Sequence, residues 1–150
     1  MQSLTFALSA AVALFAALQW RVYHNQLRFQ LYSRRYEIYL AVKEFLAQIV
    51  KRYDVTADEP MVLLQRTRDH EFLFPPSVGK YLHSVYDKAV EFNFVLAASK
   101  PLEANSPELH ANVDEQSRLF KWFEGELKEG AFATFLPFLD FRNVGGRWAR

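Results

Sequence analysis

The chain has 150 residues, of which 51% are hydrophobic and 16% aromatic, with only 5 Gly and 6 Pro. This composition excludes an intrinsically disordered chain, and the length fits one modest domain that leans toward helix. The chain has no cysteine, which excludes a disulfide framework, a thiolate nucleophile and cysteine-based zinc or iron–sulfur sites.

The formal net charge of +1 hides a strong segregation of charge along the chain. Residues 1–36 contain four arginines and no acidic residue, residues 37–140 contain 11 basic and 17 acidic residues, and the last ten contain three arginines and no acid. Basic ends around an acidic middle suit a chain whose ends lie near anionic lipid.

The first long apolar stretch runs from Leu4 to Trp20. As a helix it would be about 26 Å long, and with the three preceding residues roughly 30 Å, the thickness of a bilayer's hydrocarbon core. A signal peptide and a soluble core helix are the alternatives, but a signal peptide carries its positive charge before the apolar run, whereas here the charge follows it. We therefore predict a transmembrane anchor over residues 1–20.

The residues that follow the apolar stretch match a membrane–water interface. Trp20 and Tyr23 would form an aromatic belt, and Arg21 and Arg28 would reach the lipid head groups. By the positive-inside rule, these arginines place the rest of the chain in the cytoplasm, as a single-pass protein of the inner membrane. A periplasmic domain is the alternative if the anchor is cleaved.

Residues 21–36, which we call the stalk, are basic and lack Pro and Gly, as does the chain as far as Tyr53. One helix is therefore expected to continue from the anchor through the stalk into the domain. Its apolar residues from position 38 onward recur every three or four residues and predict a core-facing stripe: Ile38, Tyr39, Val42, Phe45, Leu46, Ile49, Val50 and Tyr53.

Three further helices are expected in a bundle over residues 37–141. The second opens at Asp58, Glu59 and Pro60 and ends before Pro75, and the third runs from Pro76 or Ser77 to about Ser99. The fourth opens at Ser106, Pro107 and Glu108, is weakened or ended by Gly130 and Pro137, and is followed by a basic tail over residues 142–150. The predicted fold is all-α, with an N-terminal transmembrane helix that continues into an antiparallel bundle of about four helices.

Parts of this layout resemble a group of small uncharacterised bacterial proteins. The resemblance lies in residues 31–39 (LYSRRYEIY), 41–46 (AVKEFL) and 66–74 (RTRDHEFLF), followed by Tyr81 and Leu82. It implies one N-terminal apolar helix before a helical cytoplasmic domain, and it implies no particular activity.

The four histidines, His24, His70, His83 and His110, are candidate metal ligands. His83 with Asp87, and His110 with Asp114, are each spaced so that the pair shares a helix face. Two such faces packed together would hold a divalent cation, but ordinary surface polarity explains the same pairs, and we expect neither a metal nor a cofactor.

A charged cluster precedes Phe72, and its acids have two possible roles. The structural interpretation is that Asp69 and Glu71 pair with Arg34 and Arg35 of the first helix. Catalysis by His70 is the alternative, but a catalytic histidine needs an orienting partner and a substrate within hydrogen-bond reach, which sequence adjacency does not supply.

Aromatic residues near the end of the chain are candidates for an interaction surface. Phe120, Trp122 and Phe123 occupy consecutive helix faces, and Phe132, Phe135, Phe138 and Phe141 recur every three residues. A wide core closed by a capping tail is the plain interpretation. The sharper one is that Phe120, Trp122 and Phe123 receive a partner protein, a second copy or the membrane surface.

No glycine-rich phosphate-binding or nucleophile-elbow motif occurs in the chain, so nucleotide and hydrolase chemistry have no support. We expect no nucleic acid or small-molecule substrate, because attraction to anionic lipid accounts for the arginines. The expected function is a non-enzymatic, membrane-anchored interaction or scaffolding module that forms a homo-oligomer or binds a protein partner. The alternative is an accessory subunit of a membrane-associated enzyme or effector complex, whose site forms only with the partner.

Overall fold

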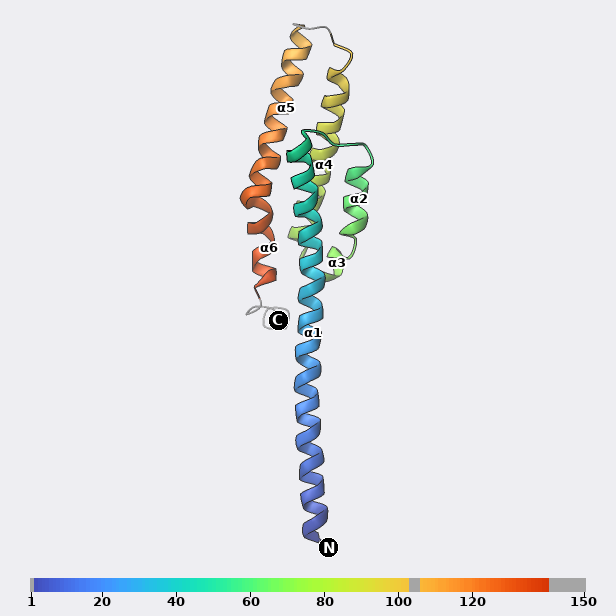
Figure 1. Ribbon diagram of the computed structural model, residues 1–150, viewed down its shortest axis with the longest axis vertical. Helices are drawn as coiled ribbons and strands as arrows, with labels where there is room; N and C mark the ends of the chain where they lie inside the picture. The colour runs from blue at the N-terminus through green and yellow to red at the C-terminus, as the bar shows by residue number, and fades with distance from the viewer. Residues whose placement is uncertain (1, 103–105, 141–150) are drawn as a thin grey trace.

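The computed structural model describes residues 2–102 and 106–140, with side chains described from residue 12 onward. Every regular element in this part of the chain is a helix, so the all-α prediction is confirmed (Figure 1). The elements are α1 (Gln2–Arg52), α2 (Glu59–Arg66), α3 (His70–Leu73), α4 (Pro76–Ser99), α5 (Pro107–Gly125), the π-helical segment η1 (Glu126–Gly130) and α6 (Ala131–Leu139).

The longest element, α1, is one helix of 51 residues. Its N-terminal half projects alone from the rest of the molecule, and the other helices pack around its C-terminal half (Figure 1). The chain then runs down through α2 and α3, up through α4 and down through α5, η1 and α6, which gives the expected antiparallel bundle of about four helices. The prediction that the stalk continues without a break into the bundle is confirmed.

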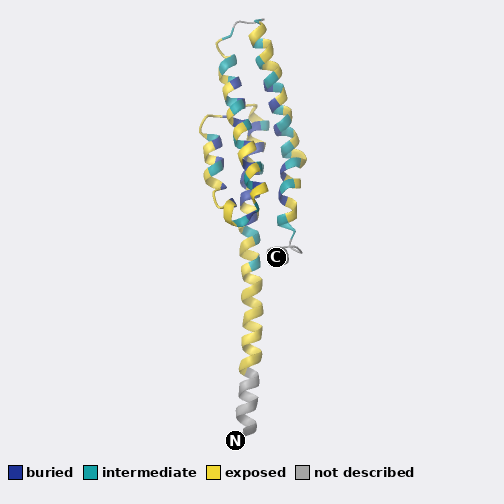
Figure 2. Ribbon diagram, turned by 180° about the vertical axis from the view of Figure 1, so that it is seen from behind, coloured by how far each residue is buried: buried dark blue, intermediate teal, exposed yellow. Residues whose placement is uncertain are grey.

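The core lies where α1, α4 and α5 run side by side (Figure 2). Most of the predicted stripe of α1 is buried there, and Val50 packs against it, whereas Tyr53 stays 42% exposed. Side chains with no exposed surface fill the centre: Val42, Leu46, Ile49, Leu82, Val85, Phe92, Leu119, Phe123 and Phe135. Burying a large apolar side chain contributes about 1.5–3 kcal/mol, so this cluster is the main source of the bundle's stability.

The helix α1 ends in an unusual way, because Tyr53 adopts a left-handed backbone conformation with φ 54°. Its N–H donates to the carbonyl of Ile49 (2.8 Å), which closes the last turn. The left-handed conformation is costly for a residue with a Cβ. Contacts of the Tyr53 ring with Phe120 (4.5 Å between ring centroids) and Phe92 (5.7 Å) offset that cost.

The segment predicted as one short second helix is divided into α2 and α3. Between them Thr67 is fully buried, and its hydroxyl donates to the carbonyl of Leu63 (2.9 Å). The predicted cap at Asp58 is also wrong in detail, since its side chain accepts no capping hydrogen bond. The neighbouring Glu59 carboxylate instead accepts from the backbone N–H of Thr56 (2.8 Å) and from Arg52 (2.6 Å).

The last helical segment begins as predicted and continues further than predicted. The Ser106 hydroxyl accepts from the N–H of Leu109 (3.1 Å), the expected N-cap. Gly130 does not end the helix, because the chain passes through the π-helical η1 into α6, which contains Pro137. Phe141 and the basic tail over residues 142–150 lie outside the described residues.

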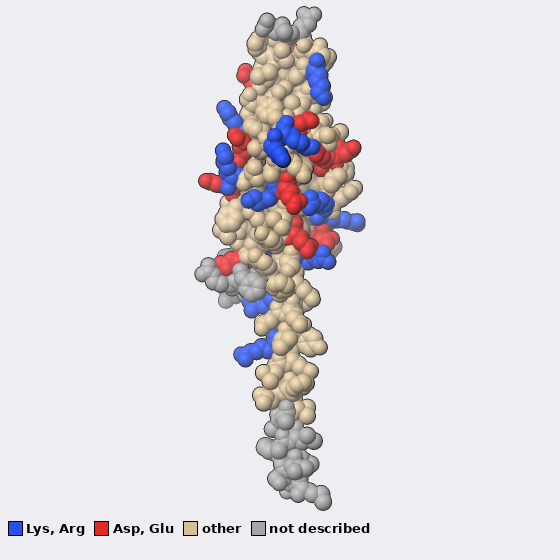
Figure 3. All heavy atoms as spheres, viewed as in Figure 1, with Lys and Arg blue, Asp and Glu red and all other residues tan. Residues whose placement is uncertain are grey.

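Charge is distributed differently over the bundle and the stalk. Acidic and basic side chains alternate over the visible face of the bundle, whereas the projecting part of α1 shows basic side chains and no acidic ones (Figure 3). The bundle therefore has a mixed surface, and the stalk has a basic one.

Candidate functional site

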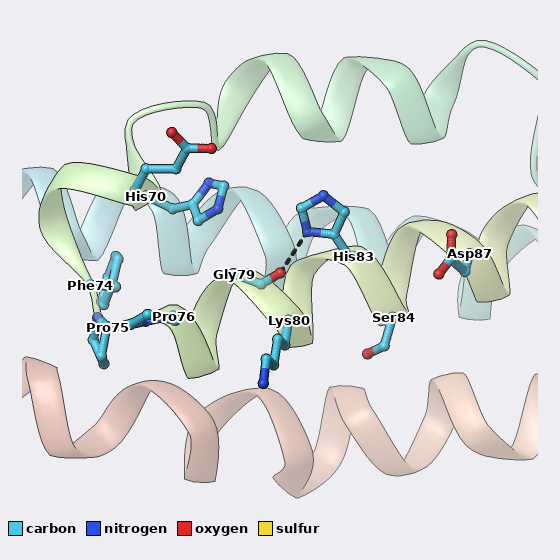
Figure 4. A pocket seen from close by; sticks show the side chains of 10 residues that line it. His70, Phe74, Pro75, Pro76, Gly79, Lys80, His83, Ser84 and Asp87 are labelled. Carbon is cyan, nitrogen blue, oxygen red and sulfur yellow. Dashed lines mark hydrogen bonds between the residues drawn. The ribbon is translucent and has the colours of Figure 1, made fainter.

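A hollow in the bundle surface with a volume of about 560 Å³ lies where α3 turns into α4 (Figure 4). Its walls are formed by α3, the two prolines after it and the first three turns of α4: His70, Glu71, Phe74, Pro75, Pro76, Gly79, Lys80, His83, Ser84 and Asp87. The extended backbone of Phe74 before Pro75 ends α3, and the proline pair opens α4. This turn brings two histidines from different helices to one site.

His70 is 9% exposed, and a hydrogen bond fixes its tautomer. Its Nδ1 lies 2.8 Å from the carbonyl oxygen of Thr67. A carbonyl oxygen can only accept, so Nδ1 carries the hydrogen and a neutral His70 keeps a lone pair on Nε2. A Cβ atom added at Gly79 would lie 3.1 Å from this Nε2, so the glycine leaves room for the ring.

His83 is exposed on α4, and the same reasoning applies to its ring. Its Nδ1 lies 2.8 Å from the carbonyl oxygen of Gly79, so Nδ1 donates and Nε2 has the lone pair (Figure 4). The two imidazole rings meet edge to face, with centroids 6.4 Å apart. The site thus presents two imidazoles whose orientations are set by backbone carbonyls.

The described residues bring no third ligand to these histidines. Asp87 also lines the cavity, one helical turn beyond His83, and Glu71 is exposed on α3. Among the residues that the structure describes, no group of three or more His, Cys, Asp or Glu is close enough to hold a metal ion. Chemically, the pair can accept hydrogen bonds or protons at Nε2.

The hypothetical metal site formed by His83, Asp87, His110 and Asp114 is wrong. Tyr81 on α4 donates to Glu126 (2.9 Å), so the first turns of α4 lie beside the end of α5. His110 lies at the beginning of α5, roughly 20 Å further along at 1.5 Å per residue. The antiparallel register therefore separates the two His–Asp pairs.

The predicted ion pairs between the two arginines and the acids of the second helical segment are also wrong. Arg34 pairs with Glu37 on its own helix (3.0 Å). Arg35 is 5% exposed, and it donates to the carbonyls of Leu73 (2.9 Å) and Phe138 (3.3 Å). Asp69 and Glu71 form no ion pair with the other described residues.

The helices that those pairs were expected to join are nevertheless connected. The C-termini of α3 and α6 carry partial negative charge, and Arg35 meets both of them, with its guanidinium 5.7 Å from the centre of the Phe74 ring. A separate ion pair joins Arg66 of α2 to Glu44 of α1 (2.8 Å). The first helix is therefore joined to the second helical segment as expected, but through backbone carbonyls and through Glu44 instead of Asp69 and Glu71.

The aromatic interaction surface is not found where it was predicted. Phe123 is fully buried in the core, while Phe120 and Trp122 pack against it as half-buried side chains. Three consecutive faces can contact the core because α5 packs against both α1 and α4. Further along, Phe135 is buried, Phe138 is half-buried and Phe132 is 51% exposed, which supports the plain interpretation of a wide core.

The four predicted membrane-interface residues lie on the projecting part of α1. Trp20 and Tyr23 are 69% and 68% exposed, Arg21 is exposed and Arg28 is half-buried. Residues 1–11 of the predicted anchor lie outside the part whose side chains are described. Within the described residues, no helix has the length and apolar character needed to span a bilayer.

Sequence reasoning missed the joint site of His70 and His83. The bond from His83 to Gly79 was detectable, because residues four apart are neighbours on a helix. The burial of His70 had no signal in the sequence, since it depends on the break at Thr67 and on the packing of α3 against α4.

In comparisons with known proteins, no family model, no curated protein and no solved structure matches the chain.

Proposed function

We propose that this chain is a non-enzymatic, membrane-anchored interaction protein, with the N-terminal part of α1 in the inner membrane and the bundle on the cytoplasmic side. The observation that carries the proposal is the projecting half of α1. Its described side chains from Val12 to Leu27 are all exposed (Figure 2), and they include the large apolar residues Phe15, Leu18 and Trp20.

Those apolar side chains surround the helix. At about 100° per residue, Val12, Leu14, Phe15 and Trp20 point in four different directions, and alanines fill the widest gap between them. A helix that packs on one protein partner is apolar along one stripe, whereas a helix surrounded by lipid is apolar on all sides. This pattern favours lipid as the surroundings of the segment that ends at Trp20.

The charges beside that segment support the direction of insertion. Arg21, Arg28 and Arg34 follow it closely on its C-terminal side. The positive-inside rule keeps such a flank in the cytoplasm.

Membrane fractionation with paired substitutions tests the anchor. Leu8→Arg with Val12→Arg should move the protein to the soluble fraction, because each arginine at the centre of a span costs about 2.5–3.5 kcal/mol. Leu27→Arg with Leu31→Arg, on exposed positions of the stalk, is the matched control and should stay with the membrane. A wild-type protein that is released by alkaline carbonate washing contradicts the proposal.

The orientation is tested with a single cysteine added after Arg150, because the chain has no other. A membrane-impermeant maleimide should label this cysteine only after the inner membrane is broken. Labelling in intact spheroplasts, whose outer membrane has been removed, places the bundle on the opposite side.

The cavity at His70 and His83 favours a second candidate, an accessory subunit whose site is completed by a partner chain. Two oriented imidazoles with free Nε2 lone pairs and no third ligand among the described residues form half of a site. Under this candidate, His83→Ala abolishes the partner's activity while the bundle keeps its melting temperature. Under the scaffolding proposal, the exposed His83 is replaced with no loss of function or binding.

A further inference from the structure

We propose that the stalk pairs in parallel with the stalk of a second copy of this chain. The inference rests on the proposed function in one respect, since the anchor places residues 21–36 in water beside the membrane. It deepens that function by naming the partner.

The evidence is a repeat along α1 with alternating spacings of three and four residues. We call these seven residues the seam: Phe15, Leu18, Val22, Asn25, Phe29, Tyr32 and Tyr36. They occupy positions a and d of successive heptads, the pattern that places a continuous stripe against a partner helix in a coiled coil. Six of the seven are apolar or aromatic.

Six of the seven seam residues are exposed, and Tyr32 is half-buried. Phe15, Val22 and Phe29 are 63%, 56% and 61% exposed, and Tyr36 is still 40% exposed beside the bundle. At about 100° per residue, the seam lies roughly 120° around α1 from the stripe that faces the bundle core. The seam ends where the bundle begins. The next d position is Tyr39, which is buried with its ring centroid 5.6 Å from that of Phe135, and the next a position is the charged Lys43.

Neither water nor lipid is a favourable environment for the seam in the stalk. An isolated helix in water is marginal at this length, and exposed Val22, Phe29 and Tyr36 add an unfavourable apolar surface. Arg21, Asn25 and Arg28 lie within the same two turns, so burial in hydrocarbon would be costly. A second helix with the same seam covers the apolar residues and leaves the charges in water.

The flanks of the seam select the parallel arrangement. From residue 19 onward, the g positions are Arg21, Arg28 and Arg35, and the e positions up to residue 33 are the uncharged Gln19, Gln26 and Ser33. Arg35 is buried in the bundle, so Arg21 and Arg28 are the g residues that a partner helix would meet. In a parallel pair, each g residue faces an e residue of the other helix, so arginine meets an amide or a hydroxyl. In an antiparallel pair, g faces g, and arginine would meet arginine.

Two single residues agree with this arrangement. The Nε of Arg28 is buried and has no hydrogen-bond partner among the described residues, and a parallel partner offers it the hydroxyl of Ser33. Asn25 is the single polar residue of the seam, at a d position, and amides of two parallel copies would face each other there. The rings of Tyr32 and Tyr36 already stack in parallel, 6.0 Å apart, as one flat apolar surface.

Single-cysteine crosslinking in membranes tests the proposal with the full-length chain. Parallel pairing brings identical a or d positions within the Cα separation of about 4.4–6.8 Å that a disulfide needs. Val22→Cys, Asn25→Cys and Phe29→Cys should therefore form disulfide-linked dimers under mild oxidation. The controls Tyr23→Cys, Leu27→Cys and Leu31→Cys are also at exposed positions but off the seam, and they should remain monomers. Equal crosslinking at all six positions, or a maximum at 27 and 31, overturns the proposal.

A second pair of variants measures association without crosslinking. Phe29→Glu should reduce the detergent-solubilised particle from two chains to one, whereas Leu27→Glu should leave it at two. Both residues lie outside the bundle, so the melting temperature of the bundle should not change in either variant. A wild-type protein with the mass of one chain overturns the inference. Membrane fractionation distinguishes a failure of the paired seam from a failure of the membrane anchor. A periodic crosslinking pattern in a soluble protein refutes the anchor alone. A membrane-bound protein without that pattern refutes the seam alone.

Discussion

Two adjacent arginines show how far residue type falls short of residue role. Arg34 is exposed and pairs with Glu37 one turn away on the same helix, an interaction that contributes little in water. Arg35 is buried, and burial lowers the pKa of its guanidinium from the ordinary value. Its two carbonyl partners end different helices, so this one side chain joins α1 to α3 and α6.

Replacing Arg35 with alanine should destabilise the bundle by about 3 kcal/mol, because charged hydrogen bonds are lost and two carbonyls are left unpaired. The matched control, Arg34→Ala, should cost less than about 0.5 kcal/mol. Chemical denaturation of the detergent-solubilised chain measures both changes. Equal losses in the two variants would mean that the buried contacts of Arg35 carry no stability.

A pH effect is expected at Tyr81, whose hydroxyl donates to Glu126 (2.9 Å). Burial, with a further contribution from the Glu126 charge, raises the pKa of Tyr81 above its ordinary value of 10.0. In the unfolded chain this phenol loses its proton near pH 10, whereas in the folded chain it keeps it. The stability that Tyr81 contributes is therefore complete below pH 10 and is lost as pH rises above that value.

The test compares the free energy of unfolding at pH 9 and pH 11. The decline over this interval should be smaller in Tyr81→Phe than in the wild type. Tyr23→Phe, on the exposed stalk, should decline like the wild type. An unchanged decline in Tyr81→Phe would show that the hydroxyl is not protected by the fold.

At the scale of elements, local signals predicted most helix boundaries. Proline after an extended residue fixed the beginning of α4, and Ser106 with Pro107 fixed that of α5. The division of α2 from α3 was missed, because Thr67 carries no breaker signal and is held by its burial and by the bond to Leu63. Gly130 was misinterpreted, because a π-helical turn can absorb a position that an α-helix would find unfavourable.

The π-helical turn also explains why position 130 is glycine. A Cβ atom there would overlap the carboxylate of Glu126, the group that accepts the hydrogen bond from Tyr81. Gly130→Ala should therefore gain less than the usual benefit of alanine in a helix, or lose stability, as Glu126 is pushed away from Tyr81.

Gly125 is the matched control, since nothing lies within 4 Å of a Cβ at that position. Gly125→Ala should raise stability by up to about 1 kcal/mol, the difference between the two residues in a helix interior. Thermal unfolding followed by circular dichroism measures both variants. An equal gain at both positions would refute the role assigned to Gly130.

At the scale of the whole molecule, the helices were predictable but their register was not. Periodicity identifies the face of each helix that is buried, yet it carries no information on which turn of one helix meets which turn of another. That register separates His83 from His110, brings His70 beside His83 and places Arg35 between two helix ends. The candidate site was missed for this reason, although both of its histidines were considered from the sequence.

The division into a stalk and a bundle predicts how truncated chains behave. A chain that begins at Ser33 retains every core residue and Arg35, so it should be a water-soluble monomer with cooperative thermal unfolding. A chain that begins at Ile38 loses Arg35 and should melt at a lower temperature. Size-exclusion chromatography with light scattering and calorimetry test both. Aggregation of the longer chain would mean that the bundle depends on residues before Ser33.

Because α1 has no break, the number of residues in the stalk determines the rotation of the bundle about the helix axis relative to the seam. Each residue inserted between the seam and the bundle turns the bundle by about 100° about the helix axis and moves it by about 1.5 Å. Inserting three or four residues turns it in opposite senses, and inserting seven nearly restores the original direction. Because α1 is one continuous helix, it fixes the direction in which each bundle faces. A partner that recognises the paired molecule should therefore lose its binding when three or four residues are inserted and regain it when seven are inserted.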